Sequence, residues 1–120
     1  MARKSFSHRD QAYLLDILIA SRKAIEFVSN LTFQEFINSE LHQNAVIRPL
    51  EIIGEAARKI SGDTKSIYPQ IPWGEMIGMR NRLIHEYLDI DLSTVWDTIQ
   101  NDLPDLIFII EPLIPPEENI

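Results

Sequence analysis

Cysteine is absent from this chain of 120 residues. A disulfide framework and a thiolate metal site are therefore both excluded. Long apolar runs are also missing: the longest, such as residues 106–110, are far too short to span a bilayer, and residues 1–10 lack the apolar stretch of a secretory signal. These absences predict a soluble, cytoplasmic protein that does not associate with membranes.

Lysine and arginine are absent from residues 83–120, which carry nine carboxylates. The whole chain has 11 basic and 18 acidic residues, a net charge of -7. This balance has the wrong sign for a protein that grips nucleic acid by bulk electrostatic attraction. Any contact with RNA must then depend on a local basic patch on an acidic body, and non-specific binding should be weak.

Strand patterns are absent too, and the 45% apolar residues recur at helical spacing, which predicts one all-α domain over residues 1–120. Ser7 begins a capping signal for a first helix that should run to about Ser29, and the capping box over Thr32–Glu35 predicts a short second helix. A third helix should continue until Gly62 stops it. Its apolar residues alternate three and four apart and are Val46, Leu50, Ile53, Ala57 and Ile60.

The second half of the chain should contain two more helices. Residues 63–71 are expected to form a loop that feeds a fourth helix, whose first turn tolerates Pro72. A fifth helix is predicted from Val95 to Leu113, kinked by Pro104. The acidic tail, about residues 115–120, should be flexible.

Residues 80–87, Arg-Asn-Arg-Leu-Ile-His-Glu-Tyr, gather a histidine, two guanidinium groups and a phenol in the second half of the predicted fourth helix. Arginine offers a fixed fork of donors to phosphate oxygens, and histidine can take or give a proton near neutral pH without a metal. We therefore interpret the segment as a metal-free RNA-cleaving site, or half of one.

Helical spacing bears on how such a site would be completed. Arg80 and His85 lie roughly 140° apart around an undistorted helix, so they do not point at the same phosphate. Either the helix loosens near His85, or a second chain completes the site across a two-fold axis. Cleavage needs one group to remove a proton and another to supply one, which favours two copies of His85. Gly74 and Gly78, four apart, also indicate the close approach of another backbone.

The residues of this segment can be given roles as hypotheses. His85 transfers the proton, and Arg80 stabilises charge on the phosphoryl oxygens. Asn81 shares a helix face with His85 and either orients it or donates to the phosphate. Arg82 either supports the site or forms an ordinary ion pair with Glu86, four residues later.

Metal ligands and paired acids are the other groups to consider. A zinc-binding helix is not expected, because Asp89 stands where the second histidine would be needed, and no Glu-x-x-His pair exists for a di-metal bundle. No metal or cofactor is therefore predicted. Glu51 and Glu55 could be paired acids, but Arg48 and Arg58 stand at salt-bridge spacing from them, which favours a structural role.

The segment 80–87 matches the Arg-x4-His-x-Tyr motif of HEPN-domain ribonuclease toxins of the HepT type. The chain resembles that family over nearly its whole length, since further blocks match in the same order. These blocks are Ile52-Ile53-Gly54-Glu55-Ala56-Ala57, Ile71-Pro72-Trp73, Gly78-Met79-Arg80-Asn81 and Val95-Trp96-Asp97-Thr98-Ile99.

The resemblance implies an all-α, HEPN-type bundle of four to five helices that forms a homodimer and cleaves RNA in a cleft between the protomers. It implies catalytic roles for Arg80 and His85, and it allows Glu55 to be a neighbour of the site. In the families that this chain resembles, a companion minimal nucleotidyltransferase acts as antitoxin and transfers adenylate to the motif tyrosine, here Tyr87.

Two classes of function follow from these observations. The first is a toxin that acts as a metal-independent endoribonuclease and leaves a 2',3'-cyclic phosphate and a 5'-hydroxyl. The second is a non-catalytic HEPN subunit that binds RNA, a nucleotide or a nucleotidyltransferase partner. The intact motif favours the enzyme, whereas the acidic composition and the lack of a second basic cluster beyond Arg80 favour the binding subunit.

Overall fold

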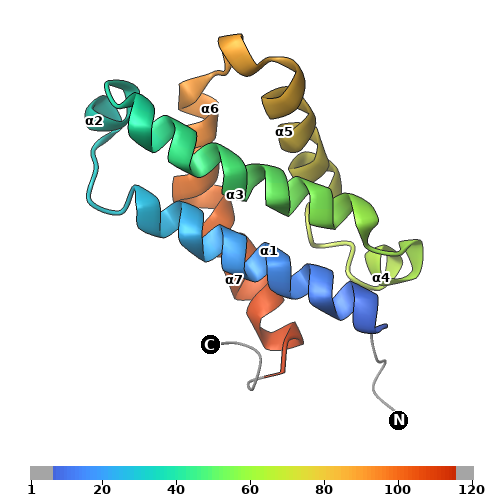
Figure 1. Cartoon of the computed structure of the whole chain (residues 1–120). Helices are drawn as coiled ribbons and strands as arrows, with labels where there is room; N and C mark the ends of the chain where they lie inside the picture. The colour runs from blue at the N-terminus through green and yellow to red at the C-terminus, as the bar shows by residue number, and fades with distance from the viewer. Residues whose placement is uncertain (1–6, 116–120) are drawn as a thin grey trace.

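The computed structural model describes residues 7–115, apart from the side chain of Tyr87. Helices dominate this part of the chain and no strand occurs in it, so the predicted all-α class is confirmed (Figure 1). The α-helices are α1 (His8–Phe27), α2 (Phe33–Ile37), α3 (Glu40–Lys59), α4 (Gly62–Ile67), α5 (Trp73–His85), α6 (Leu92–Asp97) and α7 (Leu103–Ile110). Short 3-10 helices cover Tyr87–Asp89 and Glu111–Leu113.

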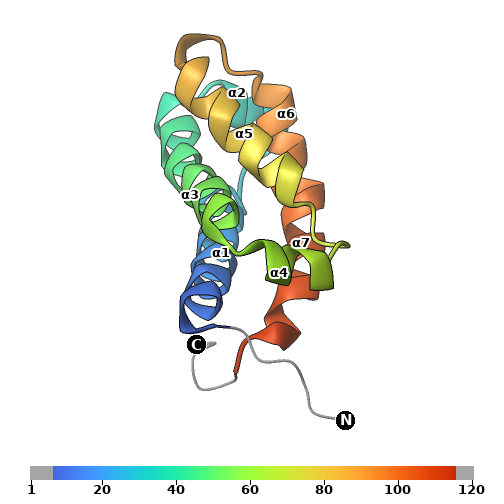
Figure 2. The ribbon, with the colours of Figure 1, turned by 90° about the vertical axis from the view of Figure 1, so that its right-hand side faces the viewer.

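The long helix α3 lies between α1 and α5, and α7 packs against α1 (Figures 1 and 2). The apolar faces of these helices meet in one core, where each fully buried aliphatic side chain contributes about 1.5–3 kcal/mol to folding. The buried side chains include Leu14, Ile17, Leu18, Val46, Leu50, Ile53, Ile99, Leu103 and Ile110. Because α5 packs on α3, residues of these two helices meet at the site described below.

The helix starts predicted from short-range signals are confirmed. The hydroxyl of Ser7 accepts a hydrogen bond from the N–H of Asp10, and α1 begins at His8, directly after Ser7. Both bonds of the capping box form, because Thr32 accepts from the N–H of Glu35 while the Glu35 carboxylate accepts from the N–H of Thr32. The first helix ends at Phe27, two residues before the predicted Ser29.

The loop predicted over residues 63–71 is wrong in its first half, because Gly62–Ile67 form α4. Gly62 does not stop α3, which has already ended at Lys59. The reason is tertiary: the buried carboxylate of Asp10 on α1 accepts hydrogen bonds of 2.6 Å from the hydroxyls of Ser61 and Thr64. Burial alone would raise the pKa of Asp10, but these hydrogen bonds outweigh it and hold the pKa below its usual value.

The fifth predicted helix is interrupted near Pro104, by a π-helical segment over Thr98–Asp102 between α6 and α7. Proline lacks an N–H and its ring crowds the carbonyl four residues earlier, and a wider turn absorbs both effects. Residues 116–120, in which most of the acidic tail lies, are outside the described residues. None of the described helices is long and apolar enough to cross a membrane.

Candidate active site

Helix α5 carries four of the predicted site residues in its second half: Arg80, Asn81, Arg82 and His85. Its start is set by Pro72 and by Trp73, whose indole N–H donates to the Tyr68 carbonyl at 3.0 Å. At the other end the N–H of Glu86 donates to the Arg82 carbonyl at 2.8 Å, the ordinary α-helical pairing. The helix therefore stays regular as far as His85.

The prediction that residues 80–87 lie in one helix is wrong after His85. Glu86 leaves the helical conformation with φ -119° and ψ 38°, and Tyr87 begins a separate 3-10 helix. Seven residues of continuous helix would place Tyr87 on the face of Arg80, but the helix ends before Tyr87 and this register is lost. The side chain of Tyr87 is outside the described part of the structure, so its role stays a prediction.

Gly54 lets α3 and α5 cross closely at Arg80. A Cβ on Gly54 would lie 2.2 Å from the Cβ of Arg80 and 2.6 Å from the carbonyl oxygen of Met76. Only glycine fits there without moving a helix. The predicted close approach at Gly74 and Gly78 is wrong within this protomer, because a Cβ at either would meet nothing within 4 Å in the described structure.

Replacing Gly54 with alanine should destabilise the fold by about 2 kcal/mol and displace Arg80, since overpacking at a helix crossing forces the backbones apart. Gly78→Ala is the matched control: it is also in a helix, has free space, and should gain up to about 1 kcal/mol of helix propensity. Urea unfolding at one fixed protein concentration measures both. If the two variants unfolded at the same urea concentration, Gly54 would not set the α3–α5 spacing.

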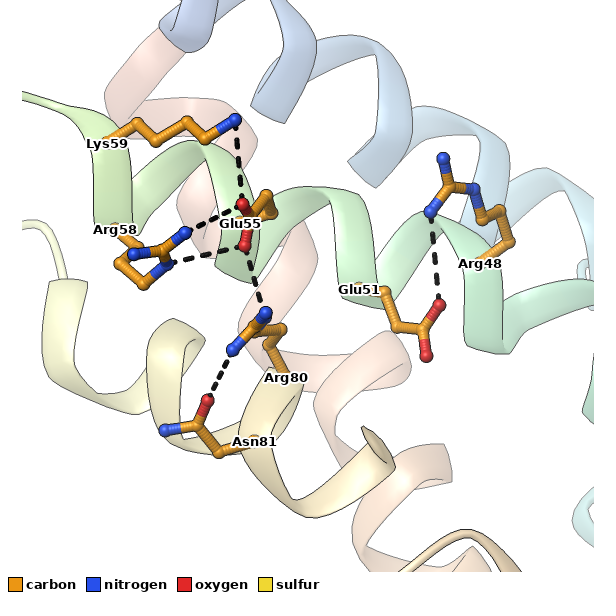
Figure 3. Close-up of polar contacts among 7 residues, drawn as sticks. All are labelled: Arg48, Glu51, Glu55, Arg58, Lys59, Arg80 and Asn81. Carbon is orange, nitrogen blue, oxygen red and sulfur yellow. Dashed lines mark hydrogen bonds and ion pairs between the residues drawn. The ribbon is translucent and has the colours of Figure 1, made fainter. Parts of the chain in front are cut away.

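The carboxylate of Glu55, next to Gly54, is the centre of an ion-pair cluster (Figure 3). Its Oε1 lies 3.2 Å from Nε of Arg80, and its Oε2 lies 2.9 Å from an Nη of Arg58 and 3.5 Å from Nζ of Lys59. We call Arg58, Lys59 and Arg80 the cation cluster. Glu55, on α3, thus links this helix to α5 by contacting Arg80. Its part in the site stays a prediction.

Glu55 is poorly suited to be a general acid. The hydrogen bond from Arg58, together with the charges of Arg58, Arg80 and Lys59, holds the pKa of Glu55 below its usual value, although partial burial opposes this. A lowered pKa keeps the carboxylate ionised, and its ion pairs are lost only as the pH falls through that value. Glu51 has its own partner, Arg48, at 4.0 Å, which supports the predicted structural role for these acids.

Arg80 is held from two sides. Its Nε forms an ion pair with Glu55, and its Nη1 donates a hydrogen bond of 2.9 Å to the Oδ1 of Asn81. Its second terminal nitrogen, Nη2, has no partner among the described residues, and the side chain is 24% exposed. Asn81 therefore contacts Arg80, whereas His85 is exposed and makes no hydrogen bond within the described residues. The structure brings together Arg80, Asn81 and Glu55, and leaves His85 apart.

Arg82 lies on another side of α5. It is exposed, forms no ion pair with Glu86 within the described chain, and its charge helps to lower the pKa of Asp91, after the hydrogen bonds from Thr94. It lines a groove of about 820 Å³ between α5 and α6–α7, which neither Arg80 nor His85 lines. The other lining residues are mostly apolar, with carboxylates at Glu75, Asp102 and Asp105.

This groove is unsuited to RNA. Burial raises the pKa of Asp102, and the neighbouring carboxylates of Glu75, Asp105 and Asp97 raise it further. Such mutual repulsion marks a surplus of negative charge, which would repel a phosphate backbone. The cation cluster around Glu55 carries the opposite charge and is therefore the better place for an anionic group.

Sequence reasoning placed Arg58 only in an ion pair and did not single out Lys59. Their spacing of three and four from Glu55 predicts helical ion pairs, and these form. Nothing in the sequence indicates that α5 brings Arg80 to the same carboxylate. Among residues 7–115, no three side chains of His, Cys, Asp or Glu come together in a way that could hold a metal ion.

The model of the ribonuclease HepT-like family matches residues 17–113, a span that includes the whole candidate site. A Methanocaldococcus jannaschii protein named as a putative RNase is 46% identical over 99 residues, which cover 82% of this chain and 91% of that protein. A Thermococcus cleftensis protein named as a probable ribonuclease HepT is 45% identical over 100 residues, covering 83% and 89% respectively. No solved structure matches significantly.

Proposed function

The chain belongs to the ribonuclease HepT-like family, and from this we propose that it is a metal-independent endoribonuclease acting as the toxin of a toxin–antitoxin pair in the cytoplasm. The observation that carries the proposal is the prearranged guanidinium of Arg80. Glu55 and Asn81 hold two of its nitrogens and leave Nη2 for a ligand. A fixed guanidinium stabilises charge on a phosphoryl group without reorganising during the reaction.

The proposed reaction is an internal transfer within RNA. The ribose 2'-oxygen bonds to phosphorus while the bond from phosphorus to the 5'-oxygen breaks, leaving a 2',3'-cyclic phosphate and a 5'-hydroxyl. One proton leaves the 2'-hydroxyl and one reaches the departing 5'-oxygen, and His85 is the group proposed to transfer protons. Arg80 neutralises charge on the phosphoryl oxygens throughout.

A site shared by two chains is proposed for geometric reasons. Loosening of the helix near His85 would have let one chain present both groups, but α5 keeps its α-helical pairing to the Glu86 N–H. Arg80 and His85 of one chain then point roughly 140° apart around α5. A two-fold axis that brings Arg80 of one protomer to His85 of its partner would complete the site.

Incubating the purified protein with single-stranded RNA in excess chelator tests the proposed function. Cleavage with cyclic-phosphate ends supports it. An intact RNA under conditions where the protein is folded would instead favour the alternative, a non-catalytic subunit that binds RNA, a nucleotide or a nucleotidyltransferase. One observation favours that alternative: His85 has no hydrogen-bond partner among the described residues to set its tautomer.

Control by a cognate minimal nucleotidyltransferase antitoxin is the remaining part of the proposal, with Tyr87 as the modified residue. An adenylate group on its hydroxyl would add a bulky anion two residues along the chain from His85 and repel the RNA backbone. We expect co-expression with the antitoxin to add adenylate mass to the peptide that contains Tyr87, and Tyr87→Phe to stay toxic in its presence. Full neutralisation of an active Tyr87→Phe protein would mean that the antitoxin acts by covering the site.

A further inference from the structure

Three cations from two helices meet around the one carboxylate of Glu55 (Figure 3). Arg58 and Lys59 come from the end of α3, and Arg80 comes from α5. Together they leave a local surplus of positive charge on a chain whose net charge is -7. This is the local basic patch that RNA contact on an acidic body requires, and it adds Arg58 and Lys59 to the basic group at Arg80.

The outer two cations are accessible and have donors to spare. The side chains of Arg58 and Lys59 are 52% and 47% exposed, twice the exposure of Arg80. Arg58 uses Nε and one terminal nitrogen on Glu55, and Lys59 approaches with one of its three donors. Since exposed ion pairs contribute little to stability, fold stability alone does not account for three cations at one point.

The direction of the helices gives the cluster an orientation. α3 and α5 run past each other in opposite directions, so that the end of α3 lies near the start of α5 (Figures 1 and 2). Arg58 and Lys59 therefore lie on the side of Arg80 that faces away from His85, the last residue of α5. An RNA strand that places its scissile phosphate on Arg80 can continue onto these two side chains.

We propose that Arg58 and Lys59 bind the RNA phosphate next to the scissile one, and that Glu55 is a positioning residue that keeps the cation cluster together. The inference rests on the proposed ribonuclease function. It assigns Arg80 to the reacting phosphate and the two outer cations to a neighbouring, unreactive phosphate. Because an unreactive phosphate is bound equally in the ground state and the transition state, the outer cations affect KM and leave kcat unchanged.

The test compares two double variants that remove the same charge. Arg58→Gln with Lys59→Gln removes the outer cations, while Lys23→Gln with Arg48→Gln removes two exposed cations elsewhere, Arg48 about 15 Å along α3 from Arg58. We expect the first variant to raise KM for single-stranded RNA about tenfold at unchanged kcat, and the control to change neither.

Direct binding separates this inference from the proposed function. In a His85→Ala background, a fluorescent single-stranded RNA oligonucleotide is titrated at several salt concentrations. Loss of one phosphate contact should make the negative slope of log affinity against log salt shallower by about 0.7. Only the outer-cation variant should show this change. A salt slope and affinity equal to those of the control variant would overturn the inference, even if the protein cleaves RNA. If RNA binding depends on Arg58 and Lys59 but the parent protein with His85 intact cleaves no RNA, the phosphate site is upheld and the proposed function is wrong.

Glu55→Gln tests the positioning role, because its two effects have opposite signs. Removing the carboxylate removes a negative charge and makes the cluster more positive, so RNA binding should be at least as tight as in the parent. Arg80 loses its Nε partner, so kcat should fall about tenfold. If Glu55 had a purely structural role, its replacement would change stability without lowering kcat while RNA affinity is kept. An unchanged or higher kcat would show that Glu55 does not position Arg80.

Discussion

Replacement of His85 by alanine is expected to abolish RNA cleavage while the protein stays folded. Loss of a positioned proton-transfer group lowers rates by about 10²–10⁴-fold. The side chain is exposed at the end of α5 and has no hydrogen-bond partner among the described residues, so its removal should change stability by less than about 0.5 kcal/mol. Cleavage of a labelled RNA in chelator, with circular dichroism of the same preparation, measures both quantities.

A matched control is His8→Ala, which removes another exposed histidine from a helix end, at the start of α1. That variant should cleave like the parent protein. If folded His85→Ala protein cleaved RNA at the parental rate, the proposed mechanism would be wrong. If both variants lost activity, the assay would be reporting general damage to the fold.

Mixing two inactive variants, Arg80→Ala and His85→Ala, is expected to restore activity. In a site that takes Arg80 from one chain and one His85 from its partner to carry both protons, each mixed dimer has one intact site and one that lacks both groups. A site that needs both copies of His85 would stay inactive in the mixture. Equal mixing gives mixed dimers as half of the population, so about one quarter of the parental activity should return. Each variant alone, refolded in the same way, provides the baseline.

The mixed experiment needs proof that mixed dimers form. Differently tagged chains, purified through both tags, supply pure mixed dimers, which should show about half of the parental activity. Purified mixed dimers without activity would contradict the pairing of Arg80 with the partner's His85. An active protein that sediments only as a monomer would exclude any shared site.

Signals confined to a few residues predicted the starts of α1 and α2 correctly. The caps at Ser7 and over Thr32–Glu35 could be read from the sequence because donor and acceptor lie three residues apart. The start of α4 was not predicted. Ser61 caps this helix locally, but the carboxylate that stabilises Ser61 belongs to Asp10, 51 residues earlier. The apolar periodicity predicted one long helix around Pro104. The structure has a π-helical segment just before the proline, and which wider turn accommodates a proline depends on packing.

The candidate site likewise combines features determined by the sequence with features determined by the tertiary structure. The sequence by itself determined which chemistry is available, because Arg80, Asn81 and His85 lie within six residues of one helix. The spacing also predicts that Arg80 and His85 diverge on an undistorted helix, and the structure shows that α5 stays regular as far as His85. Only the tertiary structure decided that Gly54, and neither Gly74 nor Gly78, is the point of close approach within the described part of one chain.

The same crossing decided the surroundings of Arg80. Glu55, Arg58 and Lys59 read as an ordinary set of helical ion pairs, because spacing along α3 says nothing of what packs on it. The crossing at Gly54 brings the guanidinium of Arg80 within 3.2 Å of the same carboxylate and so creates the cation cluster. The identities and spacings of charged groups are properties of the sequence, whereas their convergence on the Glu55 carboxylate depends on the packing of α5 on α3.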